Sequence, residues 1–159
     1  MTTAALFFDD LFIGREFATS GLTITEDAII RFGIEWDFQP FHVDRVAAAG
    51  SIHGSVVASG LHTLAVTMRL CVQSGLFTGT VVAGFEWGRI CLLRPVRPGD
   101  TLRAVVTVKS TRRSRSRPEL GIVKWGVLTL NQSDEVVLDT SATNLIATCR
   151  STPSARPAR

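Results

Sequence analysis

The chain of 159 residues contains no tyrosine and only three cysteines, Cys71, Cys91 and Cys149. The cysteines lie at least 20 residues apart and form no Cys-x-x-Cys pair. This spacing predicts neither a disulfide framework nor a zinc site. We therefore expect reduced thiols in the core of a cytoplasmic protein, with no metal and no cofactor.

Long apolar runs are also missing, since no stretch approaches the roughly 18 to 20 apolar residues that cross a bilayer. The first ten residues lack a basic segment and carry Asp9 and Asp10, which argues against a secretory signal. Hydrophobic residues nevertheless make up 45% of the chain, and charged residues only 19%. This composition and length predict one folded domain with a substantial core.

A strong charge imbalance is absent as well, because 17 basic residues against 14 acidic ones give a formal net charge of +3. Residues 150–159 hold three arginines and no acid, so the remainder of the chain is neutral. Four more arginines cluster in residues 111–117. A local excess of this kind is weak evidence for nucleic-acid binding. We expect a domain over residues 1–149, a disordered basic tail over 150–159, and neither nucleic acid nor a membrane as a partner.

The order of the expected elements indicates the fold class. Apolar residues 1–14 are expected to pack at an edge of the fold. Thr25 has the properties of a helix N-cap and Gly33 those of a stop signal. Gly75 ends a long helix that begins at Gly54 and is apolar on nearly every face, as a buried helix would be. The expected elements are a strand at 16–24, helices at 26–33, 43–49 and 54–74, one or two strands at 81–93, and strands at 101–110, 121–131 and 135–148.

One long buried helix before a run of strands predicts an α+β fold, in which an antiparallel sheet wraps around that helix. This layout is that of the hot-dog fold.

The residues between these helices carry the candidate chemistry. Asp37 and His42 flank a turn at Pro40, which can direct both side chains into one space. A carboxylate and an imidazole facing one pocket can hold a water molecule and move its protons. The N–H of Gly54, at the expected start of the long helix, could stabilise negative charge on a carbonyl oxygen.

This segment resembles a known family. Asp37-x-Gln39-Pro40-x-His42-x-Asp44 is similar to the Asp-x-Asn-Pro-x-His-x-Asp signature of MaoC-like dehydratases, which include the (R)-specific enoyl-CoA hydratases. The resemblance extends over roughly residues 10 to 148, through later motifs that include 57–63, 85–87, 94–100, 114–123, 131–132 and 135–137.

The resemblance implies a hot-dog fold, a homodimer or an oligomer of dimers, and an acyl-CoA substrate, with coenzyme A entering only as part of that substrate. It implies reversible addition of water to a 2-enoyl-CoA, with Asp37 and His42 as the catalytic pair and Gly54 at the thioester carbonyl. Gln39 stands where the signature has Asn, and the link from His42 to Gly54 is shorter than is usual in these hydratases. These departures leave the turn and the acyl pocket different from the pattern.

Alternatives remain open at this stage. The protein could instead be an acyl-CoA thioesterase on the same fold, or a non-catalytic acyl-CoA-binding subunit. Asp37 could cap a helix and His42 could be a core histidine. Asp44 is expected to be a local cap. The remaining candidates for substrate binding, each with a structural alternative, are His53 at the pocket mouth, Ser59 and His62 on the long helix, and Arg115 and Arg117, which could contact coenzyme A phosphates or form a solvated hairpin.

Overall fold

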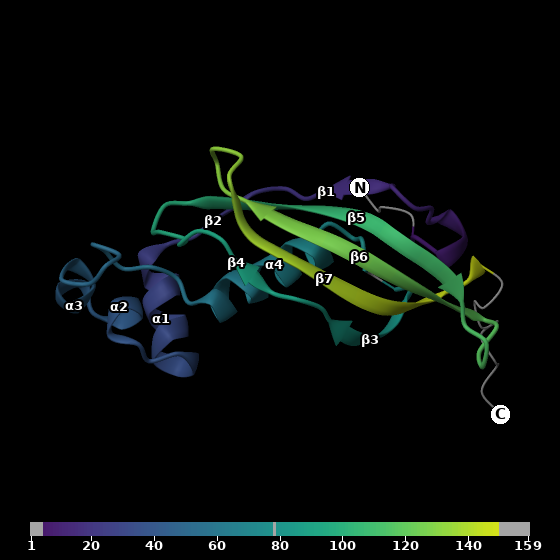
Figure 1. Ribbon diagram of the computed structural model, residues 1–159, viewed down its shortest axis with the longest axis horizontal. Coiled ribbons are helices and arrows are strands. Elements are labelled where there is room, and N and C mark those ends of the chain that lie inside the picture. Colours follow the sequence, from purple (N-terminus) through teal and green to yellow (C-terminus); the bar gives the residue numbers. More distant parts are fainter. Residues whose placement is uncertain (1–4, 78, 150–159) are drawn as a thin grey trace, which may run out of the picture.

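The computed structural model describes residues 5–77 and 79–149 (Figure 1). A seven-stranded antiparallel sheet has the main order β1-β5-β6-β7-β3, while β2 pairs with β5 and β4 with β7. The strands are β1 (Glu16–Ala18), β2 (Leu22–Thr23), β3 (Val81–Trp87), β4 (Cys91–Leu92), β5 (Thr101–Arg113), β6 (Leu120–Leu130) and β7 (Val136–Ala147).

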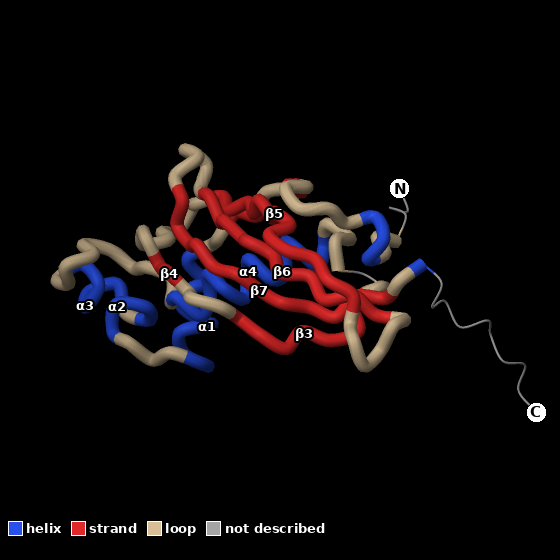
Figure 2. Tube along the Cα trace, turned by 45° about the vertical axis from the view of Figure 1, so that its right-hand side comes forward, coloured by secondary structure: helices blue, strands red, loops and turns tan. Residues whose placement is uncertain are grey.

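The longest helix, α4 (Gly60–Gln73), lies along one face of this sheet (Figures 1 and 2). Three shorter helices gather at one end of the sheet, and the β5–β6 hairpin lies at the other end (Figure 1). The shorter helices are α1 (Glu26–Trp36), α2 (Pro40–Val43) and α3 (Arg45–Ala49), and a single 3₁₀ turn, η1, spans Phe8–Asp10. The expected α+β class with an antiparallel sheet and a long helix is confirmed.

The long helix begins six residues later than expected, at Gly60 instead of Gly54. Residues 54–59 do not form a helix because their backbone groups bond to other segments. The N–H of Val57 donates to the carbonyl of Phe41 at 3.2 Å, and the N–H of Ala58 donates to that of Val96 at 2.8 Å. The apolar character of 56–58 therefore reflects burial of an extended segment.

Helix α4 is also less buried than its composition predicts. His62, Val66 and Leu70 are buried, whereas Leu61 and Val72 are 58% and 47% exposed. The helix therefore packs one face on the sheet and leaves a strip of the other face uncovered within this chain. Gly75 follows its end with a left-handed φ of 82°, as expected for a helix stop.

Gly33 is not a stop signal but an interior residue of α1, which continues to Trp36. A Cβ at this position would lie 2.8 Å from Val43 Cγ1 and 3.1 Å from the Cβ of His42. The missing side chain therefore lets α2 pack closely against α1. The Thr25 cap is confirmed, since its hydroxyl accepts the N–H of Ala28 at 3.2 Å.

Two other expected elements are divided. The strand expected at 16–24 forms two short pieces, β1 and β2, which both pair with β5. The helix expected at 43–49 is divided at Asp44, which ends α2 and caps α3. Its carboxylate accepts the N–H groups of Val46 and Ala47 at 2.7 and 3.1 Å, so its expected role as a local cap is confirmed.

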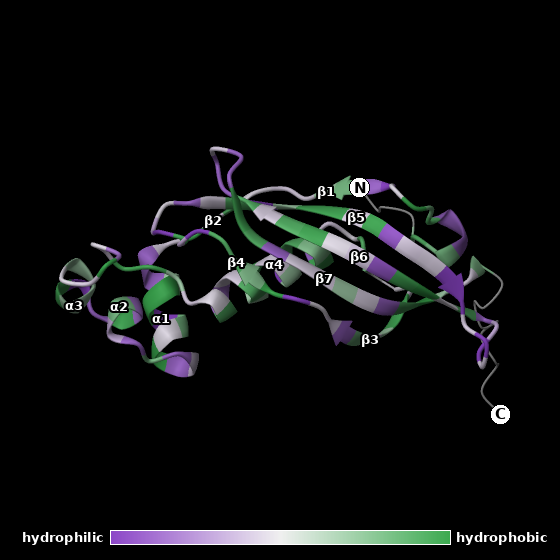
Figure 3. Ribbon diagram, viewed as in Figure 1, coloured by the Kyte–Doolittle hydropathy of each residue, from purple (hydrophilic) through white to green (hydrophobic). Residues whose placement is uncertain are grey.

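The core forms where the sheet faces α4 and the N-terminal segment. Strand β5 alternates half-buried and fully buried residues along Thr101–Val108, as a strand with one core-facing side does. Trp125 is fully buried in one cluster, together with Phe8 and Leu11 from the segment expected to pack at an edge. Figure 3 shows hydrophilic residues at the β5–β6 hairpin, at the β6–β7 turn and at the ends of α1.

The cysteines divide by burial. Cys71 is buried, Cys91 is half-buried and Cys149 is exposed, so the expectation of three core thiols holds only for Cys71. Burial raises the pKa of the Cys71 thiol to about 11. Among the described residues, no helix is long and apolar enough to span a bilayer. The basic tail expected at 150–159 lies outside the described residues.

Candidate functional site

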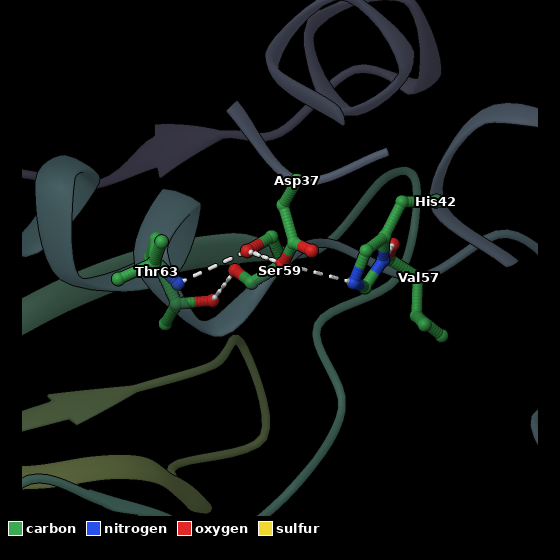
Figure 4. Close-up of polar contacts among 6 residues, drawn as sticks. Asp37, His42, Val57, Ser59 and Thr63 are labelled. Carbon is green, nitrogen blue, oxygen red and sulfur yellow. Dashed lines mark hydrogen bonds and ion pairs between the residues drawn. The ribbon is translucent and has the colours of Figure 1, made fainter. Parts of the chain in front are cut away.

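Asp37 and His42 face each other across the link between α1 and α2 (Figure 4). The Nε2 atom of His42 lies 3.5 Å from Oδ2 of Asp37. His42 is buried, whereas the Asp37 side chain is 27% exposed. The separation is long for a direct hydrogen bond and leaves both atoms able to contact one shared water molecule.

The other ring nitrogen of His42 determines which tautomer the imidazole adopts. Nδ1 lies 2.6 Å from the carbonyl oxygen of Val57. A carbonyl can only accept, so we assign the proton of the neutral ring to Nδ1. Nε2 then presents a lone pair toward Asp37 and is able to take up a proton. Val57 can thus orient the imidazole because residues 54–59 do not form a helix that would use its carbonyl.

Ser59 connects the Asp37 carboxylate to the start of α4 (Figure 4). Its hydroxyl donates to Oδ2 of Asp37 at 2.6 Å and accepts the N–H of Leu61 at 3.1 Å. Ser59 is only 2% exposed, so it does not present its hydroxyl to a ligand at the surface. Its observed contacts are with Asp37 and with the N–H of Leu61, and its expected part in substrate binding stays a prediction.

The expected role of Gly54 is wrong in its structural basis. Gly54 lies in a turn with φ +69°, and its N–H donates to the carbonyl of Ser51 at 3.1 Å. The first residue of α4 is Gly60, and no acceptor for its N–H is found within residues 5–77 and 79–149. The positive end of the helix dipole therefore lies at Gly60, beside the Asp37 carboxylate that Ser59 contacts.

A pocket of about 280 Å³ opens at this end of the fold. Its wall includes His42, His53 and Gly60, together with the exposed residues Leu92 and Leu93. A Cβ on Gly60 would collide with the side chain of Leu92. Glycine at this position therefore lets Leu92 pack directly against the start of α4. The pocket thus places an imidazole, a helix N-terminus and apolar side chains around one space.

The other two histidines have different surroundings. His53 lines the pocket, as expected, and its ring centroid lies 5.1 Å from that of Phe41. His62 instead stacks on Phe32, with centroids 4.6 Å apart and planes at 8°, and is not part of the pocket wall. Burial, and secondly the electrostatic interaction with the His42 ring, lower the pKa of His62. His62 is therefore a neutral packing residue near neutral pH.

The structure does not bring Arg115 and Arg117 to the site. Both lie in the β5–β6 hairpin, at the end of the sheet opposite α1–α3 (Figure 1). Arg117 pairs there with Glu119, its Nε lying 3.1 Å from Oε1. Within one chain these arginines therefore lie away from Asp37 and His42, and their expected contact with coenzyme A phosphates stays a prediction.

Sequence reasoning missed the Ser59–Asp37 contact, Gly60 as the helix start, and Arg94, which also lines the pocket. A signal existed for the first two, because serine directly before a helical apolar run is a favoured N-cap. No local signal points to Arg94, since it lies on a turn far from His42 in the sequence. In the described part of the chain, no group of three or more His, Cys, Asp or Glu side chains is arranged to hold a metal ion.

Comparison with known proteins shows the family of the chain. The family model described as "MaoC like domain" matches residues 10–131. The uncharacterised protein YdeM of Bacillus subtilis is 33% identical over 138 residues, which cover 87% of this chain and 96% of YdeM. A crystal structure of a MaoC-like dehydratase from Rhodospirillum rubrum is 40% identical, with a TM-score of 0.84 over 90% of this chain and 97% of that one.

The (R)-hydratase PhaJ1 of Pseudomonas aeruginosa has the same fold, with a TM-score of 0.70 over 89% of this chain and 85% of that one, at 21% identity. The family model covers most of the chain, including Asp37, His42 and Ser59. This chain therefore belongs to the MaoC-like dehydratase family, whose hot-dog fold it shares with the (R)-hydratases.

Proposed function

We propose that this protein is a hydro-lyase that reversibly adds water to the double bond of a 2-enoyl-CoA. The observation that carries the proposal is the 3.5 Å approach of His42 Nε2 to Asp37 Oδ2, beside the pocket and the start of α4. A carboxylate and an imidazole at this distance can hold one water molecule between them. Coenzyme A enters as part of the substrate, and the proposed reaction uses no further cofactor.

The proposed mechanism uses the tautomer of His42. Nε2 of His42 takes a proton from water while the oxygen bonds to the β-carbon, and the π electrons move toward the thioester. Negative charge then develops on the carbonyl oxygen, where the Gly60 N–H stabilises it; one such donor contributes about 3 kcal/mol. His42 returns the proton to the α-carbon. The Asp37 carboxylate, fixed by Ser59, orients the water and stabilises the imidazolium.

The test is to mix the purified protein with crotonyl-CoA and to follow the enoyl absorbance and the free thiol concentration together. Loss of absorbance without thiol release supports hydration, and dialysis against a chelator should leave the rate unchanged. Release of thiol would show a thioesterase instead. A rise in melting temperature with CoA esters, with neither reaction, would show an acyl-CoA-binding protein.

We also propose that two copies pair along β3 to form a homodimer. β3 is the last strand of the main order, and Val82, Phe85 and Trp87 on it are 51%, 55% and 43% exposed. An uncovered edge strand with large apolar side chains invites pairing with another strand. Sedimentation velocity should give twice the mass of the chain, and Phe85→Lys should shift the protein toward monomer. A monomeric wild-type protein at micromolar concentration would contradict this proposal.

A further inference from the structure

Of the described residues that form the pocket wall, Arg94 is the only one with a permanently charged side chain. It lies on the turn after β4 and shares the pocket with His42 and His53. The residues before it, Leu92 and Leu93, and the two after it are apolar or proline. An arginine beside apolar side chains in a pocket wall is a candidate for binding an anion.

The guanidinium of Arg94 is held from one side. Its Nη1 donates to the carbonyl of Val136 at 3.1 Å, and its Nε lies 3.3 Å from Oε1 of Glu135. The other carboxylate oxygen of Glu135 accepts the side-chain amide of Asn131 at 3.0 Å. The oxygen of that amide accepts the backbone N–H groups of Ser133 and Glu135, both at 3.0 Å. The turn before β7 thus fixes the arginine through a chain of contacts.

These contacts leave part of the guanidinium available. Within residues 5–77 and 79–149, Nη2 of Arg94 has no hydrogen-bond or ion-pair partner. The Arg94 side chain is 48% exposed, and Glu135 is 47% exposed, so water screens the attraction between them. The planar N–H fork of arginine matches the oxygens of carboxylates and phosphates.

We propose that Arg94 binds an oxyanionic group of the thioester substrate, either a phosphate of coenzyme A or a carboxylate on the acyl group. The inference rests on the proposed function for its substrate class. Arg94 takes the role that the sequence suggested for Arg115 and Arg117, which lie at the other end of the sheet. A fixed Nη2 beside the His42 pocket would select thioesters by charge, while the apolar wall accommodates the acyl chain.

The test measures binding of unreactive analogues by calorimetry, which makes it independent of turnover. The analogues are thioethers that keep the carbonyl: 2-oxopentyl-CoA, 2-oxopentyl-pantetheine without phosphates, and a CoA thioether with a carboxylate ending its acyl group. Each is titrated into wild type, Arg94→Gln, Arg103→Gln and Glu135→Gln. Arg103 is the matched control, because it pairs with Asp134 at 2.6 Å in the same turn region but does not line the pocket.

Arg94→Gln should weaken binding by about tenfold for the ligands whose anion Arg94 contacts, the usual loss for one charge-assisted bond. If the anion is a phosphate, both CoA ligands weaken and the pantetheine ligand does not. If it is the acyl carboxylate, only the carboxylate ligand weakens. Arg103→Gln should change none of them.

Glu135→Gln separates ligand binding from a structural role of the ion pair. Breaking the pair from this side removes a competing negative charge, so binding of the anionic ligand should stay equal or tighten. A merely structural pair would weaken binding alike in Arg94→Gln and Glu135→Gln, and that result would overturn the inference. Equal loss for all three ligands, or no loss for any, would also overturn it. The wild-type protein could bind the anionic ligands in an Arg94-dependent way and yet hydrate no enoyl-CoA. That result would support the proposed role of Arg94 and refute the proposed hydratase activity.

Discussion

The hydroxyl of Ser59 lies 2.6 Å from Oδ2 of Asp37, and the same hydroxyl accepts the N–H of Leu61 at the start of α4. One small side chain therefore performs two tasks. It caps the helix that crosses the sheet, and it holds the carboxylate that faces His42. The orientation of Asp37 depends on where α4 begins.

Separate removal of the two proposed catalytic groups gives the first prediction. Asp37→Asn and His42→Asn should each lower the hydration rate of crotonyl-CoA by at least about a hundredfold with the fold intact, because general acid–base catalysis contributes on that order. His53→Asn is the matched control, since His53 lines the same pocket without facing Asp37. Near-normal turnover in both Asp37→Asn and His42→Asn would exclude this pair.

Ser59 allows capping and carboxylate positioning to be separated. Ser59→Ala should cost about 1 kcal/mol of unfolding free energy as well as activity, whereas glycine at an N-cap costs only about a few tenths. Ser59→Gly should therefore recover most of the stability but not the rate, because neither variant can donate to Asp37. Urea denaturation and initial rates measure the two effects. Recovery of the rate in Ser59→Gly would show that only the cap matters.

Gly33 tests whether the contact between α1 and α2 positions His42. Gly33→Ala introduces a methyl 2.8 Å from Val43 and 3.1 Å from the Cβ of His42, so α2 must move. We expect turnover to fall by about ten- to a hundredfold, as small misplacements of catalytic groups do. Gly50→Ala is the control, because its nearest neighbour would be at an ordinary 3.7 Å. Equal rates in the two variants would contradict a positioning role for Gly33.

The lowered pKa of His62 predicts a pH dependence of stability. The unfolded chain binds a proton at His62 more readily than the folded chain does, so the free energy of unfolding rises with pH in that range. The stabilisation is complete above the ordinary pKa of about 6.5 and is lost as pH falls through the lower folded value. His62→Gln should lose less stability than wild type between neutral and mildly acidic pH, measured by urea denaturation. Parallel losses would refute a neutral, buried His62.

Thiol reactivity should follow burial. The Cys71 pKa of about 11 leaves little thiolate at mildly alkaline pH, and the side chain is also buried. A disulfide reagent should label native Cys149 quickly and Cys71 only after denaturant is added. Cys149→Ser should remove the fast phase, and peptide mapping identifies the labelled residues. Rapid labelling of Cys71 in the native protein would contradict this assignment.

Much of the architecture could be predicted from local patterns. Thr25 and Asp44 were predictable as caps because short polar side chains bond to nearby backbone N–H groups. The alternation along β5 and β6 identified strands with one buried face. The prediction for Gly33 was wrong because the sequence alone does not distinguish a glycine that ends a helix from a glycine that allows two helices to pack closely.

The residues of the site likewise fall into those that local sequence could predict and those that it could not. Asp37 and His42 were found because a short turn holds them together, so six residues of sequence carry the information. Ser59, Gly60 and Arg94 come from segments that meet Asp37 and His42 only after folding. The start of α4 was predicted too early. Residues 56–58 are apolar because they are buried, and an apolar run of this length does not distinguish a buried non-helical segment from a buried helix.

The sequence by itself indicated the family through the resemblance of residues 37–44 and later motifs to a known signature. It indicated the α+β class and the proximity of Asp37 to His42 through short-range patterns of turn, cap and alternation. The tertiary structure decided which nitrogen of His42 faces Asp37, where α4 begins, and which arginine reaches the pocket. Those features depend on backbone carbonyls and side chains brought together from distant segments. The hydrogen bonds that His42 donates to the Val57 carbonyl and Ser59 donates to Asp37 form only when the sheet and the helices have packed.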